Sequence, residues 1–384
     1  MQPFLFYLAL ITLLFSAGVW LVLFAGVRKL RWLKDVEPAA DRHYPKVSII
    51  VPARNEEREI EEALQSVLHL DYPDYEVLVV DDRSTDGTAA ILARMQQAYP
   101  QLAVATVTAL PPGWLGKNHA MNFGAQQAQG DLLLFTDADI IMRPDCLRRA
   151  VTYLEREKLD FLPMTPDCDM PTWLLEAFVT IFVILFTLHT RPWQLRDPKS
   201  TAHVGIGAFN LIRARVYHAI GTHAAIAMRP DDDLKLGKLV KKNGYVHDIL
   251  NGSGFLRVRW YASLSELIVG LEKNAFAGVE YSVFKTLYSS LAILIVNVWP
   301  FAAIWLTSGP TRWLYVTVVA LHCASYLSTA WQLGTRWWTV IAYPVVFLLF
   351  VYIQWRTMVL NLWLGGIRWR DTLYPLAELK ANRI

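Results

Sequence analysis

The sequence predicts an α/β domain with a mostly parallel sheet, together with transmembrane helices. Short apolar runs alternate with amphipathic stretches from Lys46 onward, the order expected of β-α-β units with right-handed crossovers. Acidic residues follow several of these runs, as ligand-binding residues do at the carboxyl edge of such a sheet. Long uncharged segments flank this part, and the 384-residue chain is 54% hydrophobic, which is too apolar for a wholly soluble protein.

A membrane anchor is predicted at residues 1–30. Residues 3–27 carry no charge, and at about 1.5 Å per residue such a helix spans the roughly 30 Å hydrocarbon core. The cations that follow at residues 28–34 indicate that this end faces the cytosol. No lysine or arginine precedes the long apolar run, which favours a retained anchor over the alternative, a cleaved signal peptide.

Strands are predicted at residues 47–52, 76–80, 102–107 and 132–135, and the runs at 47–52 and 132–135 are expected to be buried. Helices are predicted between them at residues 56–70, at 88–99 and from Asn118. Asn55 is expected to cap the first of these helices.

Pairs of acids end two of the predicted strands. Asp81 and Asp82 follow the second strand, and Asp137 and Asp139 follow the fourth. Because parallel strands present their carboxyl ends at one edge of a sheet, the two pairs are expected to converge. Carboxylate oxygens hold hard divalent cations, so the Asp-x-Asp pair is a candidate metal site. The alternative is that these acids serve surface turns.

Other functional classes lack support in the sequence. A net charge of +3, without a basic stripe interleaved with aromatics, gives no indication of nucleic-acid binding. The cysteines Cys146, Cys168 and Cys323 are scattered, so neither a disulfide framework nor a zinc site is indicated. The turn at Gly205 and Gly207 lacks the third glycine of a dinucleotide fingerprint, and the histidines show no ligand-spaced pair.

Four motifs in order carry a resemblance to a known family, at residues 51–56, 79–87, 116–122 and 136–139. Together they resemble the successive signatures of family 2 glycosyltransferases, over residues 46–280. The resemblance implies the GT-A fold, a nucleotide-sugar donor, a UDP-sugar by type, and Mg²⁺ or Mn²⁺. Residues 111–117 and the order of anchor, domain and helices resemble the hopene-associated, carotenoid-acid and ceramide glycosyltransferases. A lipid acceptor, multi-pass placement in the cell (inner) membrane and a cytosolic catalytic domain are therefore expected.

Residue roles follow from the same resemblance. Donor-binding residues are expected at Pro52, Arg54, Glu56, Asp81, Asp82, Lys117, Asn122, Asp137 and Lys273. Asp82 would bind the uracil-type nucleobase of the donor. Asp137 and Asp139 would hold the metal that neutralises the leaving diphosphate. For Lys273, a role as a juxtamembrane cation is the alternative.

The catalytic base for an inverting transfer is expected within residues 228–237, which resemble the family's paired-acid motif followed by x-x-Leu-Gly. Matching that motif assigns Asp233 as the base and Asp232 as its companion. The alternative is an acidic N-terminus of the helix that runs to Asn243. Adjacent carboxylates repel, so a raised pKa on one of them is expected.

Two competing functions are a processive polysaccharide synthase and a transporter or scaffold with a degenerate transferase domain. Processive members of the family carry the motif Gln-x-x-Arg-Trp. Here Leu256 stands at the glutamine position before Arg259 and Trp260, which disfavours a polymer synthase. The acids at all expected positions disfavour a degenerate domain.

The remaining apolar segments are assigned to the membrane. Residues 171–198 are expected to form an interfacial helical insertion, because one crossing would put the base on the wrong side; a buried core helix is the alternative. Transmembrane helices are predicted within residues 285–362, followed by a tail at 363–384. Cations in the tail indicate the cytosol, whereas three complete spans would leave the tail outside.

Overall fold

The chain forms two compact units in the computed structural model, which describes residues 2–39 and 44–384. The helical unit consists of Met1–Lys29, Met170–Thr190 and Trp260–Lys380, although Met1, the first residue of the predicted anchor, lies outside the described residues. The sheet unit consists of Leu30–Asp169, Arg191–Arg259 and Ala381–Ile384. The predicted catalytic domain at residues 46–280 therefore includes Met170–Thr190 and residues 260–280, which belong to the helical unit.

The sheet unit contains an eight-stranded sheet with the strand order β1-β10-β7-β9-β5-β2-β3-β4. Its strands are β1 (Arg31–Trp32), β2 (Val47–Ala53), β3 (Tyr75–Asp82), β4 (Leu102–Val107), β5 (Leu132–Phe135), β7 (Phe161–Thr165), β9 (Asn210–Arg213) and β10 (Leu250–Asn251). Within the described strands of this sheet, β9 pairs antiparallel with β5 and β7, and the other pairs are parallel. The prediction of an α/β fold with a mostly parallel sheet is confirmed.

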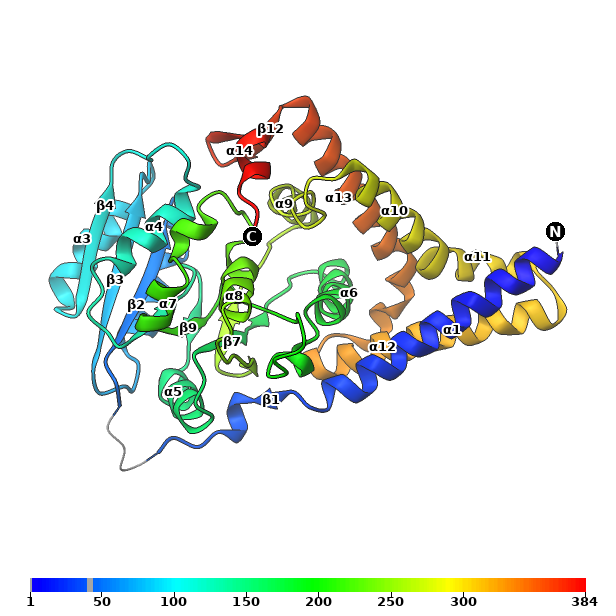
Figure 1. Cartoon of the computed structure of the whole chain (residues 1–384), viewed down its shortest axis with the longest axis horizontal. Coiled ribbons are helices and arrows are strands. Elements are labelled where there is room, and N and C mark those ends of the chain that lie inside the picture. The colour runs from blue at the N-terminus through cyan, green and yellow to red at the C-terminus, as the bar shows by residue number, and fades with distance from the viewer. Residues whose placement is uncertain (1, 40–43) are drawn as a thin grey trace. The chain divides into compact units, whose positions relative to one another are not determined.

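Helices cover both faces of this sheet (Figure 1). Along β2, Val47, Ile49 and Val51 pack with α2 and α5, whereas Ile50 points to the other face and packs with α4 and α8. The helices of the sheet unit are α2 (Ile60–Leu68), α3 (Thr88–Ala98), α4 (Gly116–Ala125), α5 (Cys146–Arg156), α7 (Ala214–Ala219) and α8 (Asp232–Lys242), with short 3-10 turns at Leu33–Asp35, Pro192–Gln194 and His223–Ile226. A small second sheet joins β6 (Ile141–Met142), β11 (Leu256–Val258) and β8 (Asp167–Cys168). Burial on both faces explains why the strands read as continuous apolar runs.

The expected cap of the first helix is wrong. Helix α2 begins at Ile60 after Glu59, and Asn55 has a left-handed backbone with φ +56°. The Asn55 side chain instead accepts a hydrogen bond from Thr85 N at 2.8 Å, and Asn55 N donates to Ser84 Oγ at 3.0 Å. Asn55 thus ties the loop after β2 to the loop after β3, a long-range role that overrides its local capping preference.

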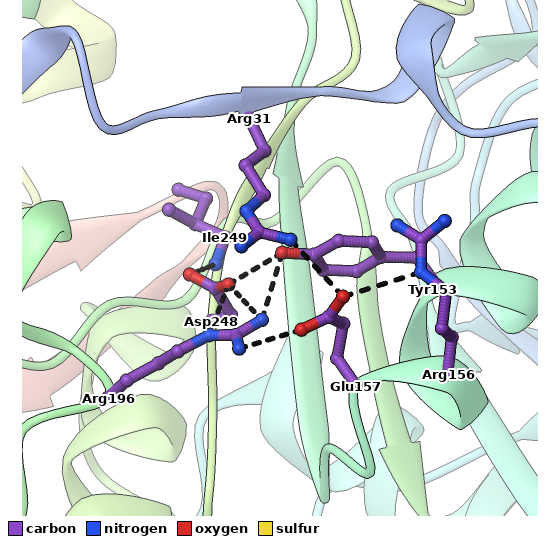
Figure 2. A network of polar contacts seen from close by, with 7 residues as sticks. All are labelled: Arg31, Tyr153, Arg156, Glu157, Arg196, Asp248 and Ile249. Atoms are coloured by element: carbon purple, nitrogen blue, oxygen red, sulfur yellow. Dashed lines mark hydrogen bonds and ion pairs between the residues drawn. The ribbon is translucent and has the colours of Figure 1, made fainter.

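A polar network fixes two segments of the sheet unit that follow apolar helices in the chain (Figure 2). Arg31 follows α1 and Arg196 follows α6, and both guanidinium groups pair with Glu157, at 3.1 and 2.8 Å. Arg196 also pairs with Asp248 at 2.7 Å, and the same carboxylate accepts the Tyr153 hydroxyl at 2.7 Å. These charge-assisted bonds hold both segments against α5 and the residues before β10.

The helical unit contains the apolar helices. Its helices are α1 (Gln2–Val27), α6 (Trp173–Thr190), α9 (Leu264–Leu271), α10 (Val283–Ile293), α11 (Trp299–Leu306), α12 (Gly309–Leu333), α13 (Tyr343–Trp363) and α14 (Leu376–Ala381), with a π-helical turn at Leu294–Val298, a 3-10 helix at Trp337–Ala342 and a hairpin of β12 (Gly366–Trp369) and β13 (Thr372–Pro375). Helix α1 lies alongside α12 (Figure 1).

Within the described residues, five helical segments have the length and composition to cross a membrane. They are Pro3–Val27, Trp173–Gln194, Val283–Leu306, Gly309–Leu333 and Trp337–Trp363. The segment that contains α6 is the most enclosed: Leu175, Phe178 and Ile181 are fully buried in a cluster with residues of α9, α12 and α13. Its interfacial placement remains a prediction.

Candidate active site

The acids predicted to converge lie at one edge of the sheet. Strands β3, β2 and β5 are parallel neighbours in that order, so their carboxyl ends face the same way. Asp81 and Asp82 close β3, and Asp137 and Asp139 follow the end of β5. The parallel register therefore brings the two acidic pairs to a common edge.

Asp82 is a buried carboxylate held by arginines. It is 3% exposed, and it accepts hydrogen bonds from Arg83 Nε at 2.7 Å and Arg83 Nη2 at 2.9 Å. Arg54 Nη1 lies 3.7 Å from the same carboxylate. Asp81 accepts a hydrogen bond from Ser84 N at 3.1 Å. The structure thus brings Arg54 and Asp82 together and assigns Asp81 a contact in the turn that follows β3.

Helix α4 begins directly against Asp82. A Cβ atom at Gly116, the first residue of α4, would overlap Asp82 Oδ2, so this close approach requires glycine. The next residue, Lys117, pairs with Asp137 at 2.7 Å and lies 3.6 Å from Asp232 Oδ2. Burial alone would lower the pKa of Lys117, but the charges of Asp137 and Asp232 raise it above its ordinary value. Lys117 is therefore a permanent cation between two groups of acids.

Pro52 and Glu56 flank the sheet edge on the β2 side. Pro52 lies within β2, and Glu56 lies on the loop after it, where its N–H donates to Thr88 Oγ1 at 2.8 Å. The Glu56 carboxylate is close enough to Asp139 to raise the pKa of Asp139. Glu56, on the loop after β2, thus adds to the negative charge around Asp139.

Asp139 lies in an environment that disfavours its negative charge. Its pKa is raised to about 7, first by burial and then by Asp137 and Glu56. Within the described part of the chain, no three His, Cys, Asp or Glu side chains form a complete metal cluster. Mg²⁺ is commonly held by one or two carboxylates, with substrate phosphates and water completing its coordination. The acidic environment of Asp139 fits such a partial site.

The acidic segment at the start of α8, Asp231 to Asp233, separates into three environments. Asp231 is paired with Arg229, with Nε–Oδ1 at 2.9 Å and Nη2–Oδ2 at 3.0 Å. Asp232 is 4% exposed and faces Lys117. Asp233 accepts hydrogen bonds from Leu234 N at 2.7 Å and Gly207 N at 3.1 Å. Burial and then Asp232 raise the pKa of Asp233 to about 7, within the range that suits a general base.

The loop through Gly205 and Gly207 connects the two acidic groups. Gly207 N donates to Asp233 Oδ2, and Gly207 O accepts from Asp137 N at 3.1 Å. A Cβ atom at Gly207 would lie 2.6 Å from Asp137 Oδ2, and one at Gly205 would overlap the main-chain oxygen of Asp233. The two glycines do not form a dinucleotide-binding motif; they let the backbone approach the acids.

The other predicted donor-binding residues have separate contacts. The amide oxygen of Asn122 accepts the Thr222 hydroxyl at 2.8 Å. Lys273 belongs to the helical unit, where its Nζ lies 4.4 Å from the centre of the Trp369 ring. Their donor contacts remain predictions.

A polar cleft adjoins Asp139. It is lined by Arg58, Glu59, Glu62, Asp139, Ile141, Asp169, Arg257, Val258 and Arg259. Arg257 lies 3.5 Å from Glu62 and 3.6 Å from Asp169, and Arg259 lies 3.9 Å from Glu59. The alternation of buried and charged residues at 256–259 is the sequence signal that marks this strand and its charged face.

A solved structure with a similar fold is that of a mannosyltransferase from Pyrobaculum calidifontis in complex with GDP-Man and Mn2+. It aligns with a TM-score of 0.55 and 21% sequence identity, covering 94% of this chain and 99% of that chain. This similarity confirms the predicted GT-A fold.

Two curated relatives are similar over part of their length. A beta-monoglucosyldiacylglycerol synthase from Synechocystis sp. is 46% identical over 112 residues, which cover 29% of this chain and 23% of the relative. A 4,4'-diaponeurosporenoate glycosyltransferase from Staphylococcus aureus is 26% identical over 220 residues, 57% of each chain. The matches therefore span from about a quarter to little more than half of these relatives.

Residues 48–221 match the family model described as Glycosyl transferase family 2. This match covers the strands that carry Asp82, Asp137 and Asp139, together with the start of α4 and the glycine loop. Residues 48–221 are therefore similar to a family 2 glycosyltransferase domain, and they lie in a unit with the GT-A fold.

Proposed function

We propose that the protein transfers a sugar from a UDP-sugar to a membrane lipid, with inversion, at the cytosolic face of the cell membrane. The observation that carries the proposal is the arrangement of Asp82, Asp137 and Asp233 around Gly116 and Lys117 in a family 2 domain. The names of the relatives, which act on a diacylglycerol and on a carotenoid acid, support a lipid acceptor.

Donor binding is assigned to the edge formed by β2 and β3. A buried carboxylate such as Asp82 is a strong acceptor for the N–H of a pyrimidine base. Arg54 and Arg83 hold that carboxylate in place. Lys117 supplies positive charge one residue beyond Gly116, at the position proposed for the diphosphate.

The leaving group is assigned to Asp137 and Asp139. A divalent cation held by these carboxylates would neutralise the charge that develops on the nucleoside diphosphate. Such a charge would favour the ionised form of Asp139, which burial, and then Asp137 and Glu56, oppose by raising its pKa. Lys117, which pairs with Asp137, would exchange this contact for one with the donor diphosphate when the donor binds.

Asp233 is assigned as the base that takes the acceptor proton. Its raised pKa makes the ionised form a stronger base than an ordinary carboxylate. Hydrogen bonds from Gly207 N and Leu234 N fix its orientation. Asp232 and Lys117 adjust the local charge, whereas Asp231 is committed to Arg229. The sugar would then be attacked by the lipid oxygen on the face opposite the leaving diphosphate.

The experiment is a transfer assay with the full-length protein in lipid nanodiscs. Labelled UDP-glucose, UDP-galactose and GDP-mannose are supplied in turn with Mg²⁺ or Mn²⁺, and extracted lipids are examined by mass spectrometry. We expect one sugar added per lipid from a UDP-sugar, at a rate that falls roughly 10²- to 10⁴-fold in D233N. Label confined to long water-soluble chains would overturn the lipid acceptor, and transfer only from GDP-mannose would overturn the UDP-sugar donor.

The proposed cytosolic face has its own test. A cysteine at Ala98, which is exposed at the end of α3, is introduced where Cys146, Cys168 and Cys323 have been replaced. An impermeant thiol reagent should label it only after cell lysis. Labelling in intact cells would overturn the cytosolic assignment. Gly87, at the other end of α3, is a poorer site for a cysteine, because a Cβ atom there would lie 2.9 Å from Glu57 Oε2.

A further inference from the structure

The residues at 381–384 belong to the sheet unit, although the preceding residues belong to the helical unit. Asn382 makes a two-way contact there: its Oδ1 accepts a hydrogen bond from Met228 N, and its Nδ2 donates to Ala225 O, both at 3.1 Å. One side-chain amide therefore satisfies a main-chain donor and a main-chain acceptor three residues apart. Such a bridge fixes the path of the backbone between them.

The same backbone segment is held from its other side by α4. Asn118, which is fully buried, donates through Nδ2 to Ile226 O at 2.8 Å and to Arg229 O at 2.9 Å. Leu115 N donates to Ala227 O at 2.9 Å. The loop at residues 225–229 thus lies between the residues at the start of α4, which include Lys117, and Asn382.

This loop leads directly to the proposed base. Arg229 is 1% exposed and holds Asp231, the residue before α8, through two hydrogen bonds. Asp232 and Asp233 are the first two residues of α8. A shift of the loop would be transmitted through this buried ion pair to the start of α8. The one residue between Arg229 and Asp231 is Pro230, whose restricted φ makes this link stiff.

A second contact holds α8 itself. Lys238 Nζ donates to the main-chain oxygen of Ile384 at 2.8 Å. The Ile384 side chain packs against the core cluster that contains Leu236 and Leu239 of α8. Residues 382–384 therefore contact the chain on both sides of the acidic segment; Figure 1 shows this end of the chain beside α8.

We infer that Asn382 is a positioning residue for transfer, which acts by fixing the loop at residues 225–229 and, through it, the position of Asp233. The inference rests on the proposed function for the role of Asp233. It assigns a specific part in the reaction to a residue far from the family match at residues 48–221. Donor binding depends on Arg54 and Asp82 at the other acidic pair, so it should be independent of Asn382.

The test compares N382A, N382D and the control N243A in the full-length protein. Asn243 lies at the other end of α8 and is exposed, and its amide donates to Leu239 O. The first readout is hydrogen exchange in peptides that cover residues 224–230, which requires no substrate. N382A should accelerate exchange of the Met228 amide, whereas N243A should leave it unchanged. Equal exchange in N382A and wild type would overturn the proposed bridge.

The second readout separates positioning from stability. N382A should lower the single-turnover transfer rate about 10- to 100-fold, the size expected when a catalytic group is displaced by about 1 Å. The affinity for UDP, measured by calorimetry, should stay within about twofold of wild type. N382D keeps an acceptor for Met228 N but loses the donor to Ala225 O, so its rate should lie between those of N382A and wild type.

The outcomes distinguish the inference from the function on which it rests. An unchanged transfer rate in N382A, or losses of rate and UDP affinity in proportion, would overturn the positioning role. The positioning role would also be overturned if the transfer rate of N382A fell only in proportion to its fraction of folded protein and N382D had the same rate as N382A. Failure of the wild-type protein to transfer any supplied sugar would overturn the proposed function instead.

Discussion

Lys117 Nζ lies 2.7 Å from Asp137 Oδ1, and the same ammonium lies 3.6 Å from Asp232 Oδ2. One cation therefore links the Asp-x-Asp pair after β5 to the acidic segment that begins α8. The Asp-x-Asp pair and Asp232 are electrostatically coupled through this lysine, so a charge change at Asp232 should be detected at Asp137.

Replacing Lys117 with methionine should destabilise the protein, because Asp232 is buried and would lose its nearby cation. The expected cost is about 1–3 kcal/mol, the usual penalty for leaving a buried polar group without its partner. Urea unfolding at pH 7.5 measures it. Adding D232N to K117M should recover most of the loss, since the uncompensated charge is removed; a double variant no more stable than K117M would contradict this account.

D139N should abolish transfer without lowering the melting temperature. Burial, Asp137 and Glu56 already oppose the charge of Asp139, so a neutral amide relieves repulsion in the metal-free protein. Titration with Mn²⁺ should raise the melting temperature of the wild type but not of D139N, because a ligand stabilises only a fold that binds it. Full transfer in excess chelator would reject the metal site.

D233N and D82A should affect different steps. D233N removes the proposed base, so UDP affinity should be unchanged while transfer slows by roughly 10²- to 10⁴-fold. D82A removes the buried acceptor proposed for the nucleobase and leaves Arg83 without its carboxylate, so UDP affinity should fall. Calorimetry and single-turnover rates separate the two effects. If D233N weakened UDP binding and transfer survived, the acidic segment would serve the N-terminus of α8 instead of supplying the base.

The transfer rate should show an acid limb near pH 7. A general base works ionised, and burial followed by Asp232 raises the pKa of Asp233 to about 7. The rate should therefore rise about tenfold per pH unit below this value and level off above it. The free energy of unfolding should change with pH in the opposite direction to the rate. An unfolded aspartate has a pKa of about 3.9, so the folded protein binds the Asp233 proton more tightly than the unfolded chain does. The contribution of Asp233 to stability therefore falls as the pH rises from about 4 to about 7.

Removing the like charge next to Asp233 provides the control for this profile. In D232N the pKa of Asp233 should fall, and the acid limb should move to lower pH. A limb at the same pH in D232N and wild type would show that another group sets the profile.

The strands and their acidic ends were predictable from the sequence because they depend on local pattern. The runs at residues 102–107 and 132–135 coincide with β4 and β5. Strand β5 is buried on both faces and consists of consecutive apolar residues, whereas β4 is a partly exposed edge strand. The convergence of Asp82 and Asp137 followed from parallel order alone.

What the sequence did not reveal depends on contacts between distant segments. Gly205 and Gly207 are required by the closeness of Asp233 and Asp137, which local spacing does not encode. Asn55 favours a helix cap locally, but its contact with Thr85 places it in a left-handed turn. The amide of Asn382 reaches a loop more than 150 residues earlier, as the separation of 154 positions from Met228 shows.

The order of the strands has a consequence for synthesis and for dissection of the protein. Strand β9 lies between β5 and β7 in the sheet, yet it follows α6 in the chain. On the ribosome, β2 to β5 can pair early, but β7 must wait for β9, which is made only after the apolar helix α6 has emerged. A single proteolytic cut cannot release the sheet unit, whose segments leave and re-enter at Asp169 and Arg191. A fragment that keeps the whole sheet unit would need linkers in place of both Met170–Thr190 and Trp260–Lys380, rather than a simple truncation.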